Sequence, residues 1–433
     1  MPATQLQPSP PRPPRRPRPR RSNPVNGSPG AGVVAHRRWI HPPRLRTAEN
    51  PRDERHATPL ELFFDLVFVV VVDALAELLT DDPSAAGVLH FLLLFATVCV
   101  AWVGYTVYAD RFDTDDLLQR VLMFCGMLAV AAVAVNIPEA FTGGSAAFAI
   151  AYVAVRAVLV AMYLRVWHAV PDARGLALRY VLGFSLSIAI WLASLAVPEP
   201  LRFAVWLFAV LVEVLTPTTA RYFAVQMQLQ ASHMAERYGL FTLIVLGGAL
   251  VAVVSGTADT NWAPASALCA AAAFIATAAV WWTYFDCVDM GGVNRTMLSR
   301  LCVAYAHCLM YAAMTAFAVG TLLLIGAAAH GREAGPAGAL LAGGVATVLL
   351  ALCAVDALAG ARANRRRIGI RLVGSTAAMG LALAGGAAAP LELAALLDAV
   401  LLTGLLCELW VAHKQTPKFR RRARCKPTAV RAS

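Results

Sequence analysis

The chain contains about twelve apolar runs, each close to the length that crosses a lipid bilayer as one helix. The hydrocarbon core of a bilayer is about 30 Å thick, and about 20 helical residues span it. The 433 residues are 59% hydrophobic and only 15% charged, a balance that excludes an ordinary soluble domain. We therefore predict an all-α, polytopic integral membrane protein with about 12 transmembrane helices. The expected spans lie near residues 60–80, 88–108, 118–136, 145–164, 176–196, 201–217, 239–257, 264–285, 301–327, 337–359, 368–388 and 391–412.

The basic residues are distributed unevenly between the two sides of this topology. If the N-terminus is cytoplasmic, all but Arg156, Arg202 and Arg332 of the 37 lysines and arginines lie in the tails or near the cytoplasmic ends of spans. Basic residues collect on the cytoplasmic side of membrane proteins. The pattern predicts a multi-pass membrane protein with an even number of spans and with both the N- and the C-terminus in the cytoplasm.

Two basic tails flank the predicted spans. Residues 1–57 are rich in proline and arginine and lack the apolar core of a signal peptide, so we expect a disordered cytoplasmic arm. Residues 414–433 form a second basic cytoplasmic tail. The tails can fix the topology or contact anionic lipids, and the first can also reflect an overlong gene start. Nucleic-acid binding is not expected, because no aromatic residue precedes Trp39.

A short pattern at the end of the second span recurs at the end of the eighth. Both copies read W-x-x-Y-x-x-x-x-D and comprise Trp102, Tyr105 and Asp110 in the first and Trp281, Tyr284 and Asp289 in the second. Equivalent motifs at equivalent places in the helix order indicate duplication. We predict two parallel six-helix repeats, residues 58–230 and 231–413, with these residues at the repeat interface. Substrate sites of secondary transporters often lie at such interfaces.

Acidic residues interrupt the first span. Thr58 and Glu61 have the spacing of a capping box, which gives Glu61 a structural role at the start of the helix. Asp65 lies one turn deeper on nearly the same face, and Asp73 lies past the bilayer midplane. A carboxylate at that depth costs about 2.5 to 3.5 kcal/mol on insertion scales, so it should be paired or hydrated. Both aspartates are predicted to point into the bundle.

Arg156 is the basic residue expected nearest the middle of a span, and its candidate partners are Asp65, Asp73 and Glu213. The pair can simply lock two helices together. Alternatively, it opens and closes as protons or substrate bind, since a carboxylate in a membrane can be neutralised by protonation. The sequence leaves both interpretations open.

His307 and the nine cysteines carry no recognised motif. A single helical histidine is more often a hydrogen-bonded packing residue than a metal ligand, although it can also carry protons near neutral pH. The cysteines contain no C-x-x-C pair, so we expect packed thiols without a metal site or a redox framework. Phosphate-binding and dinucleotide-binding glycine loops are also missing from the sequence, so no cofactor is expected.

Three segments together resemble the bacterial low-temperature-requirement A family: ELFFDLVFV at 61–69, HMAERYGLFTLIVLG at 233–247 and WWTYFD at 281–286. The resemblance implies a polytopic inner-membrane protein with no settled substrate. This chain reads Gly247-Gly248 where the family commonly has Gly-Glu, which removes a possible intramembrane ion or proton ligand. His233, Glu236 and Arg237 match the pattern, and they can cap the seventh helix or gate a cytoplasmic entrance.

Three functions remain open at this stage. The leading hypothesis is an ion-coupled transporter or permease of a small solute or protons, in which Asp65 and Asp73 bind the cation and Arg156 balances them. The alternative is a membrane-embedded enzyme that acts on a lipid or isoprenoid, with Glu61 and Asp65 as acid and base. A third possibility is a non-catalytic membrane-adaptation factor whose charges only pair helices.

Overall fold

Twelve long helices make up the computed structural model, which describes residues 41–45, 57–113, 116–220, 231–288, 297–358 and 365–424. The first six are α1 (Pro59–Asp81), α2 (Ala85–Arg111), α3 (Leu117–Asn136), α4 (Ser145–Ala169), α5 (Arg174–Ser194) and α6 (Leu201–Thr219). The second six are α8 (Ala231–Asp259), α9 (Pro264–Cys287), α10 (Met297–Ala329), α11 (Gly335–Leu358), α12 (Arg365–Ala384) and α13 (Pro390–Arg424). The remaining elements are the 3-10 turns η1 (Pro171–Ala173) and η3 (Gly385–Ala387), and β1 (Arg44–Leu45), which pairs antiparallel with β2 (Phe112–Asp113).

The predicted class, an all-α polytopic membrane protein, is confirmed. Eleven helices of the described residues are long and apolar enough to cross a membrane. The twelfth is α1, whose five acidic residues from Glu61 to Asp81 interrupt an otherwise apolar sequence. Most helix ends fall within a few residues of the predicted ones, but α13 continues to Arg424, so the predicted C-terminal tail begins as helix. Most of the predicted N-terminal tail lies outside the described residues.

The start of α1 is fixed by local hydrogen bonds. The Thr58 hydroxyl accepts a bond from the Glu61 N–H, and the Glu61 carboxylate accepts one from the Thr58 N–H, each at 3.3 Å. Pro59 occupies the first turn, where a missing N–H costs nothing. The predicted capping box is therefore confirmed, and it holds the Glu61 carboxylate at the helix end.

A second carboxylate anchors the segment that precedes α1. Asp116 caps α3 by accepting from the Gln119 N–H, and it also accepts from Arg165 on α4 and from the His41 N–H. Burial by itself raises the pKa of Asp116, but these hydrogen bonds outweigh it and hold that pKa below the ordinary value. The carboxylate is therefore ionised at neutral pH and joins residues 41–45 to the first six helices.

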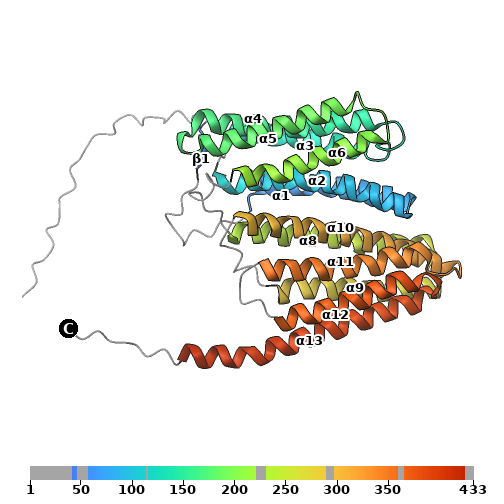
Figure 1. The fold of residues 1–433 in the computed structure, drawn as a ribbon. Coiled ribbons are helices and arrows are strands. Elements are labelled where there is room, and N and C mark those ends of the chain that lie inside the picture. Colours follow the sequence, from blue (N-terminus) through green and yellow to red (C-terminus); the bar gives the residue numbers. More distant parts are fainter. Residues whose placement is uncertain are drawn as a thin grey trace, which may run out of the picture. The chain divides into compact units, whose positions relative to one another are not determined.

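The helices lie side by side, and their contacts follow the same order in the two sets of six (Figure 1). In each set the first helix packs on the second and third, the third on the fourth, the fourth on the fifth, and the sixth on the second and fifth. This shared order agrees with a duplication of six helices, which stays a prediction. All described residues belong to one compact unit, so the two halves are not separate globular domains.

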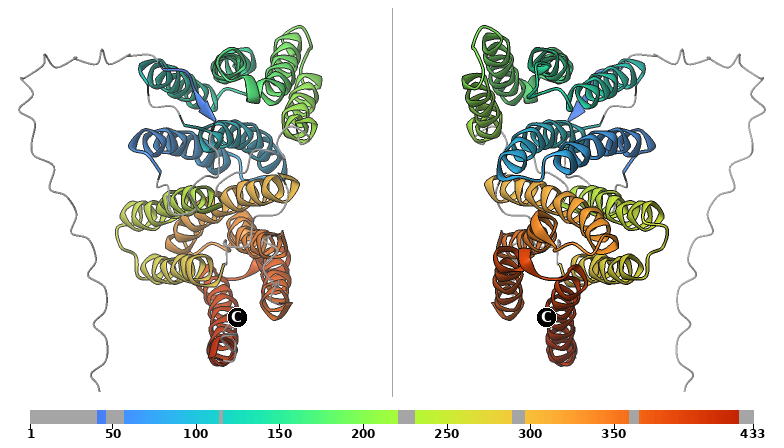
Figure 2. Two further views of the ribbon diagram at one scale, coloured as in Figure 1. Left: turned by 90° about the vertical axis from the view of Figure 1, so that its left-hand side faces the viewer. Right: turned by 90° about the vertical axis from the view of Figure 1, so that its right-hand side faces the viewer.

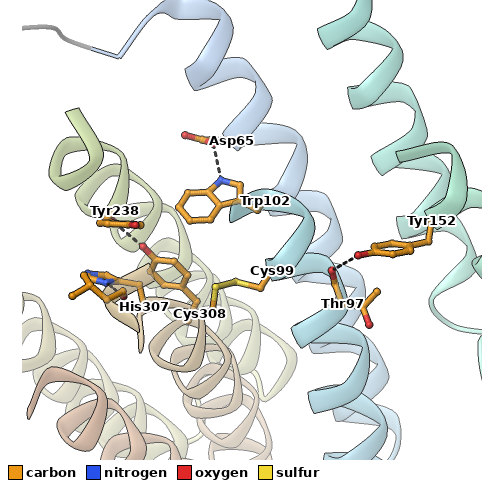
Figure 3. Close-up of a disulfide and its surroundings, with 10 residues drawn as sticks. Asp65, Thr97, Cys99, Trp102, Tyr152, Tyr238, His307 and Cys308 are labelled. Atoms are coloured by element: carbon orange, nitrogen blue, oxygen red, sulfur yellow. Dashed lines mark hydrogen bonds between the residues drawn. A yellow bond between two sulfur atoms is a disulfide. The ribbon is translucent and has the colours of Figure 1, made fainter. Parts of the chain in front are cut away.

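The two halves meet along α1 and α2 of the first and α8 and α10 of the second. Viewed along the helices, α1 and α2 lie between the rest of the first half and α8 and α10 (Figure 2). A disulfide between Cys99 on α2 and Cys308 on α10 crosses this interface, with a Cα–Cα distance of 5.9 Å (Figure 3). The expectation that the cysteines form no redox framework is wrong for this pair, because the fold brings together two thiols that are 209 positions apart.

Two glycines allow α10 and α11 to pack backbone to backbone. A Cβ atom at Gly320 would lie 2.4 Å from the Leu341 nitrogen, and one at Gly344 would lie 2.8 Å from the Ala313 carbonyl oxygen. Small residues permit such close approach between membrane helices, where packing contacts drive association. The α10–α11 pair therefore depends on the absence of side chains at these two positions.

We predict that Gly320→Ala destabilises the protein by about 1 to 3 kcal/mol, because the added methyl group forces the two backbones apart. Gly326→Ala is the matched control on the same helix, since a Cβ there meets no atom within 4 Å. The measurement is the melting temperature of the purified full-length protein in detergent. Equal melting temperatures for the two variants would contradict the close packing.

Candidate functional site

Helices α1 and α8 each place two ionisable side chains at the interface between the halves. Glu61 and Asp65 are four residues apart on α1, and His233 and Arg237 are four apart on α8, so each pair shares one helix face. Helix α2 runs in the opposite direction to α1 and adds Trp102 and Asp110. We call these six buried residues, Glu61, Asp65, Trp102, Asp110, His233 and Arg237, the interface cluster.

Asp65 is held by two donors from different helices. Arg237 of α8 donates to both carboxylate oxygens, through Nε to Oδ2 at 3.2 Å and through a terminal nitrogen to Oδ1. The Trp102 indole of α2 donates to Oδ1 at 2.7 Å (Figure 3). The guanidinium also lies 5.7 Å from the centre of the Trp102 ring, a distance that allows a cation–π interaction. The Asp65 carboxylate thus joins α1, α2 and α8.

His233 bridges two carboxylates. Its Nδ1 lies 3.0 Å from Asp110 Oδ1, and its Nε2 lies 3.0 Å from Glu61 Oε2. A neutral imidazole donates from one nitrogen only, so two ionised carboxylates would leave one of these contacts without a proton. Both contacts are hydrogen bonds when the trio carries one additional proton, on the imidazole or on a carboxyl group. The geometry of the trio can therefore accommodate one shared proton.

The balance of charge in the interface cluster depends on that proton. Glu61, Asp65 and Asp110 supply three negative charges, and Arg237 supplies one positive charge. Arg300 of α10, outside the cluster, also interacts electrostatically with Asp110. The relative exposure of these residues and of His233 is 5% or less, so water screens the charges poorly. Within the described part of the chain, Oδ2 of Asp110 has no hydrogen-bond partner. A proton on the trio lowers the net negative charge of the cluster and the repulsion between its carboxylates.

Arg156 pairs inside the first half and not with the acids of α1. Its guanidinium contacts Glu213 of α6, and its Nε donates to the Tyr152 hydroxyl at 3.0 Å. Glu213 also accepts from Tyr152 at 2.6 Å and from Ser187 at 2.5 Å. One of the three expected partners, Glu213, is therefore the observed one. The hypothesis that Arg156 balances Asp65 and Asp73 is wrong, because Arg237 takes the position beside Asp65.

Arg371 is a buried arginine, although the predicted span 368–388 puts it within one turn of a loop. It lies on α12 and donates to Asp356 of α11 at 2.8 Å and to both carboxylate oxygens of Glu408 on α13 at 2.8 Å. Asp356 and Glu408, which are acids within neighbouring spans, are the sequence feature that indicates a buried basic partner. Each half therefore contains its own buried arginine–carboxylate cluster, in addition to the interface cluster between the halves.

The aromatic residues of the repeated pattern lie in different environments. Trp102 packs against Tyr238, Phe241 and Tyr311 of the second half. Tyr105 donates to the Val155 carbonyl at 2.8 Å within the first half. Tyr284 lies 3.2 Å from His307 Nε2 within the second half, and the His307 ring stacks on Tyr238.

Two members of the second copy give the predicted repeat interface no support. The Trp281 side chain is 43% exposed on α9, whereas the second-half helices that meet α1 and α2 are α8 and α10, so its position does not favour an interface role. Asp289 lies outside the described residues. In the first copy of the pattern, Trp102 and Asp110 both contact the second half, Trp102 through ring packing and Asp110 through His233.

Asp73 and Glu236 lie at opposite ends of this region. Glu236 accepts a hydrogen bond from the Ala57 N–H at 3.3 Å, next to the start of α1. Asp73 borders a half-open cavity of about 650 Å³ between α1, α8 and α10, and its side chain is exposed. The prediction that Asp73 points into the bundle is therefore wrong, whereas the same prediction for Asp65 is confirmed. Phe241 lines the cavity and packs on both Trp102 and Tyr311, with centroid distances of 4.8 Å. Phe241 therefore lies between the cavity and Trp102 of the interface cluster.

Comparison with known proteins places the chain in a bacterial family. An uncharacterized protein of Rhizobium meliloti (strain 1021) is 28% identical over 265 residues, which cover 59% of this chain and 63% of that protein. The chain thus spans less than two thirds of the length of this relative. Residues 56–412, which include every residue of the interface cluster, match the family described as bacterial low temperature requirement A protein (LtrA). The chain therefore belongs to the LtrA family.

Proposed function

We propose that the protein is a proton-coupled transporter in which protonation of the interface cluster controls movement of the two halves. The observation that carries this proposal is the His233 bridge, which joins carboxylates of α1 and α2 to a histidine of α8. Proton binding at this position changes the attraction between the halves. A histidine titrates near neutral pH, as such a coupling site requires.

The cavity supplies the second part of the proposal. It reaches from Thr80 near the end of α1 to Phe241, and it is lined by both halves. A solute in the cavity would be separated from the charged residues of the interface cluster by the rings of Phe241, Trp102 and Tyr311. Movement of the halves that parts these rings would connect the cavity with the other end of the bundle, as alternating access requires.

An enzyme that uses Glu61 and Asp65 as acid and base receives less support from the geometry. The carboxylate of Glu61 contacts His233 and the capping Thr58, and that of Asp65 contacts Arg237 and Trp102. These carboxylates bind neighbouring helices and do not line the cavity. The interface cluster is better suited to hold and release protons than to reach a substrate.

Proton flux in proteoliposomes tests the proposal. The full-length protein is reconstituted with a pH-sensitive dye inside, and a potassium diffusion potential drives protons inward with and without a panel of small solutes. We expect flux above that of empty liposomes for the wild type, and at least a tenfold loss for His233→Gln and Asp110→Asn. Glutamine and asparagine can keep a hydrogen bond but carry no titratable proton.

Two exposed residues provide matched controls, His168→Gln and Asp172→Asn. These variants should transport protons at the wild-type rate, because they change the same side-chain types away from the interface cluster. Wild-type flux no greater than that of empty liposomes, between pH 5 and 8 and for every solute, would refute the proposal. Normal flux in His233→Gln would refute the role of the bridge.

We further propose that the protein lies in the cytoplasmic membrane with both termini inside the cell. The basic residues near the interface-cluster end of the helices support this orientation under the positive-inside rule. Labelling of intact cells with a membrane-impermeant maleimide is the test. A cysteine introduced at Asp259, at the opposite end of α8, should react from outside, and one at Asp172 should react only after lysis. The reverse pattern would contradict the orientation.

A further inference from the structure

The cavity between α1, α8 and α10 has a lining of distinctive chemistry. It is bordered by Val69, Val70, Val72, Asp73, Ala76, Glu77 and Thr80 of α1, by Phe241, Ile244, Val245, Gly247, Gly248, Val251, Ala252 and Ser255 of α8, and by Thr315, Ala318, Val319 and Leu322 of α10. Its volume of about 650 Å³ falls within the range of about 300 to 1,000 Å³ found for small-molecule sites. The space is therefore sufficient for an organic molecule.

The charges on the cavity wall have one sign. Asp73 and Glu77 are one helical turn apart on α1 at the open side of the cavity, where both side chains are exposed, and the lining residues just given include no lysine, arginine or histidine. Carboxylates within a membrane span are costly unless a counter-charge or water accompanies them. The cavity thus favours a positively charged occupant on the side of α1.

The rest of the wall is apolar with a few hydroxyl groups. Valine, isoleucine and leucine side chains and the Phe241 ring form most of the surface, and Thr80, Ser255 and Thr315 add hydroxyl groups. Such a wall would bury an apolar body next to the charged group. A bare metal ion would leave most of this surface without a partner, whereas a cation with an apolar body would use both parts of the wall.

Helix α8 borders the cavity with bare backbone at Gly247 and Gly248. A Cβ atom built at either position meets no atom within 4 Å. A side chain introduced at either position therefore starts from open space on the cavity wall. This gives a way to fill the site without changing its charges.

We propose that this cavity binds an organic cation with an apolar body, whose charge is placed by Asp73 and Glu77. The proposal deepens the transport function, since the cation would be the transported solute. Only the claim that the cation is transported rests on the proposed transport function. Binding of the cation can be measured without transport.

Equilibrium binding of radiolabelled tetraphenylphosphonium is the test, with the full-length protein in phosphatidylcholine nanodiscs and protein-free nanodiscs as background. We expect saturable binding of one cation per chain. Tetraphenylborate, an anion of the same shape and size, should not compete. The double variant Asp73→Asn, Glu77→Gln should raise the Kd at least tenfold because it removes the charge.

Gly248→Phe should raise the Kd by a similar factor because its side chain fills the cavity. Gly380→Phe is its matched control, since Gly380 on α12 also has open space and lies outside the cavity. The charge control is Glu139→Gln, Asp259→Asn, at two exposed acids. Both controls should bind with the wild-type Kd, and size-exclusion profiles and melting temperatures establish that each variant is folded.

Three results would overturn the proposal. They are the absence of saturable binding, equal competition by tetraphenylborate, and wild-type affinity in either the charge variant or Gly248→Phe. The outcomes also separate the two proposals. Cation binding without proton flux in liposomes would contradict proton-coupled transport and leave the binding site intact, whereas proton flux without cation binding would contradict only the binding site.

Discussion

The buried ion pair between Asp65 and Arg237 is the interaction on which the arrangement of the two halves depends. It connects the first helix of one half with the first helix of the other, and Trp102 completes it from α2. Removing one partner of a buried pair typically costs about 3 to 5 kcal/mol, because the other charge is left without compensation. The pair therefore fixes how α1 and α8 are rotated and aligned. With that alignment set, Glu61 and Asp110 lie on either side of His233.

This alignment gives three of the five acids of α1 different contacts. Glu61 caps the helix and contacts His233, Asp65 holds Arg237, and Asp73 borders the cavity with an exposed side chain. Glu61 and Asp65 lie one turn apart, and Asp73 lies two turns beyond them, so a single helix connects the His233 bridge with the cavity. Contacts with the second half thus explain Glu61 and Asp65 in an otherwise apolar span.

The sequence was sufficient for the helices and for the burial of Asp65, but not for the pairing of charges. The length of an apolar run and the uneven distribution of basic residues between the two sides are set by the membrane. The spans could therefore be predicted without knowledge of helix packing. The choice between Arg156 and Arg237 as the partner of Asp65 depends on which helices touch and how each is rotated, which no local pattern encodes. Arg237 was a candidate residue, but it was expected to cap its helix or to gate a cytoplasmic entrance, because it lies near the expected start of its span.

The other contacts that the sequence did not predict were missed for the same physical reason. Arg371 was missed because the expected start of α12 left it within one turn of a loop. Cys99 and Cys308 show no pairing signal because their proximity arises only when α2 and α10 pack together. The bridge of Glu61, His233 and Asp110 likewise joins three segments of the chain. The sequence marked all three residues as candidates, but not their contact with one another.

The most direct test of this account is a double-mutant cycle on the central pair. Melting temperatures would be compared for the wild type, Asp65→Asn, Arg237→Gln and the double variant, with the partly exposed pair of Glu199 and Arg202, which lies within the first half, as the reference cycle. The account predicts that each single change at the central pair lowers the melting temperature strongly, and that the double variant loses clearly less than the two single losses combined. Additive losses at Asp65 and Arg237 would contradict a coupling between the halves through this ion pair.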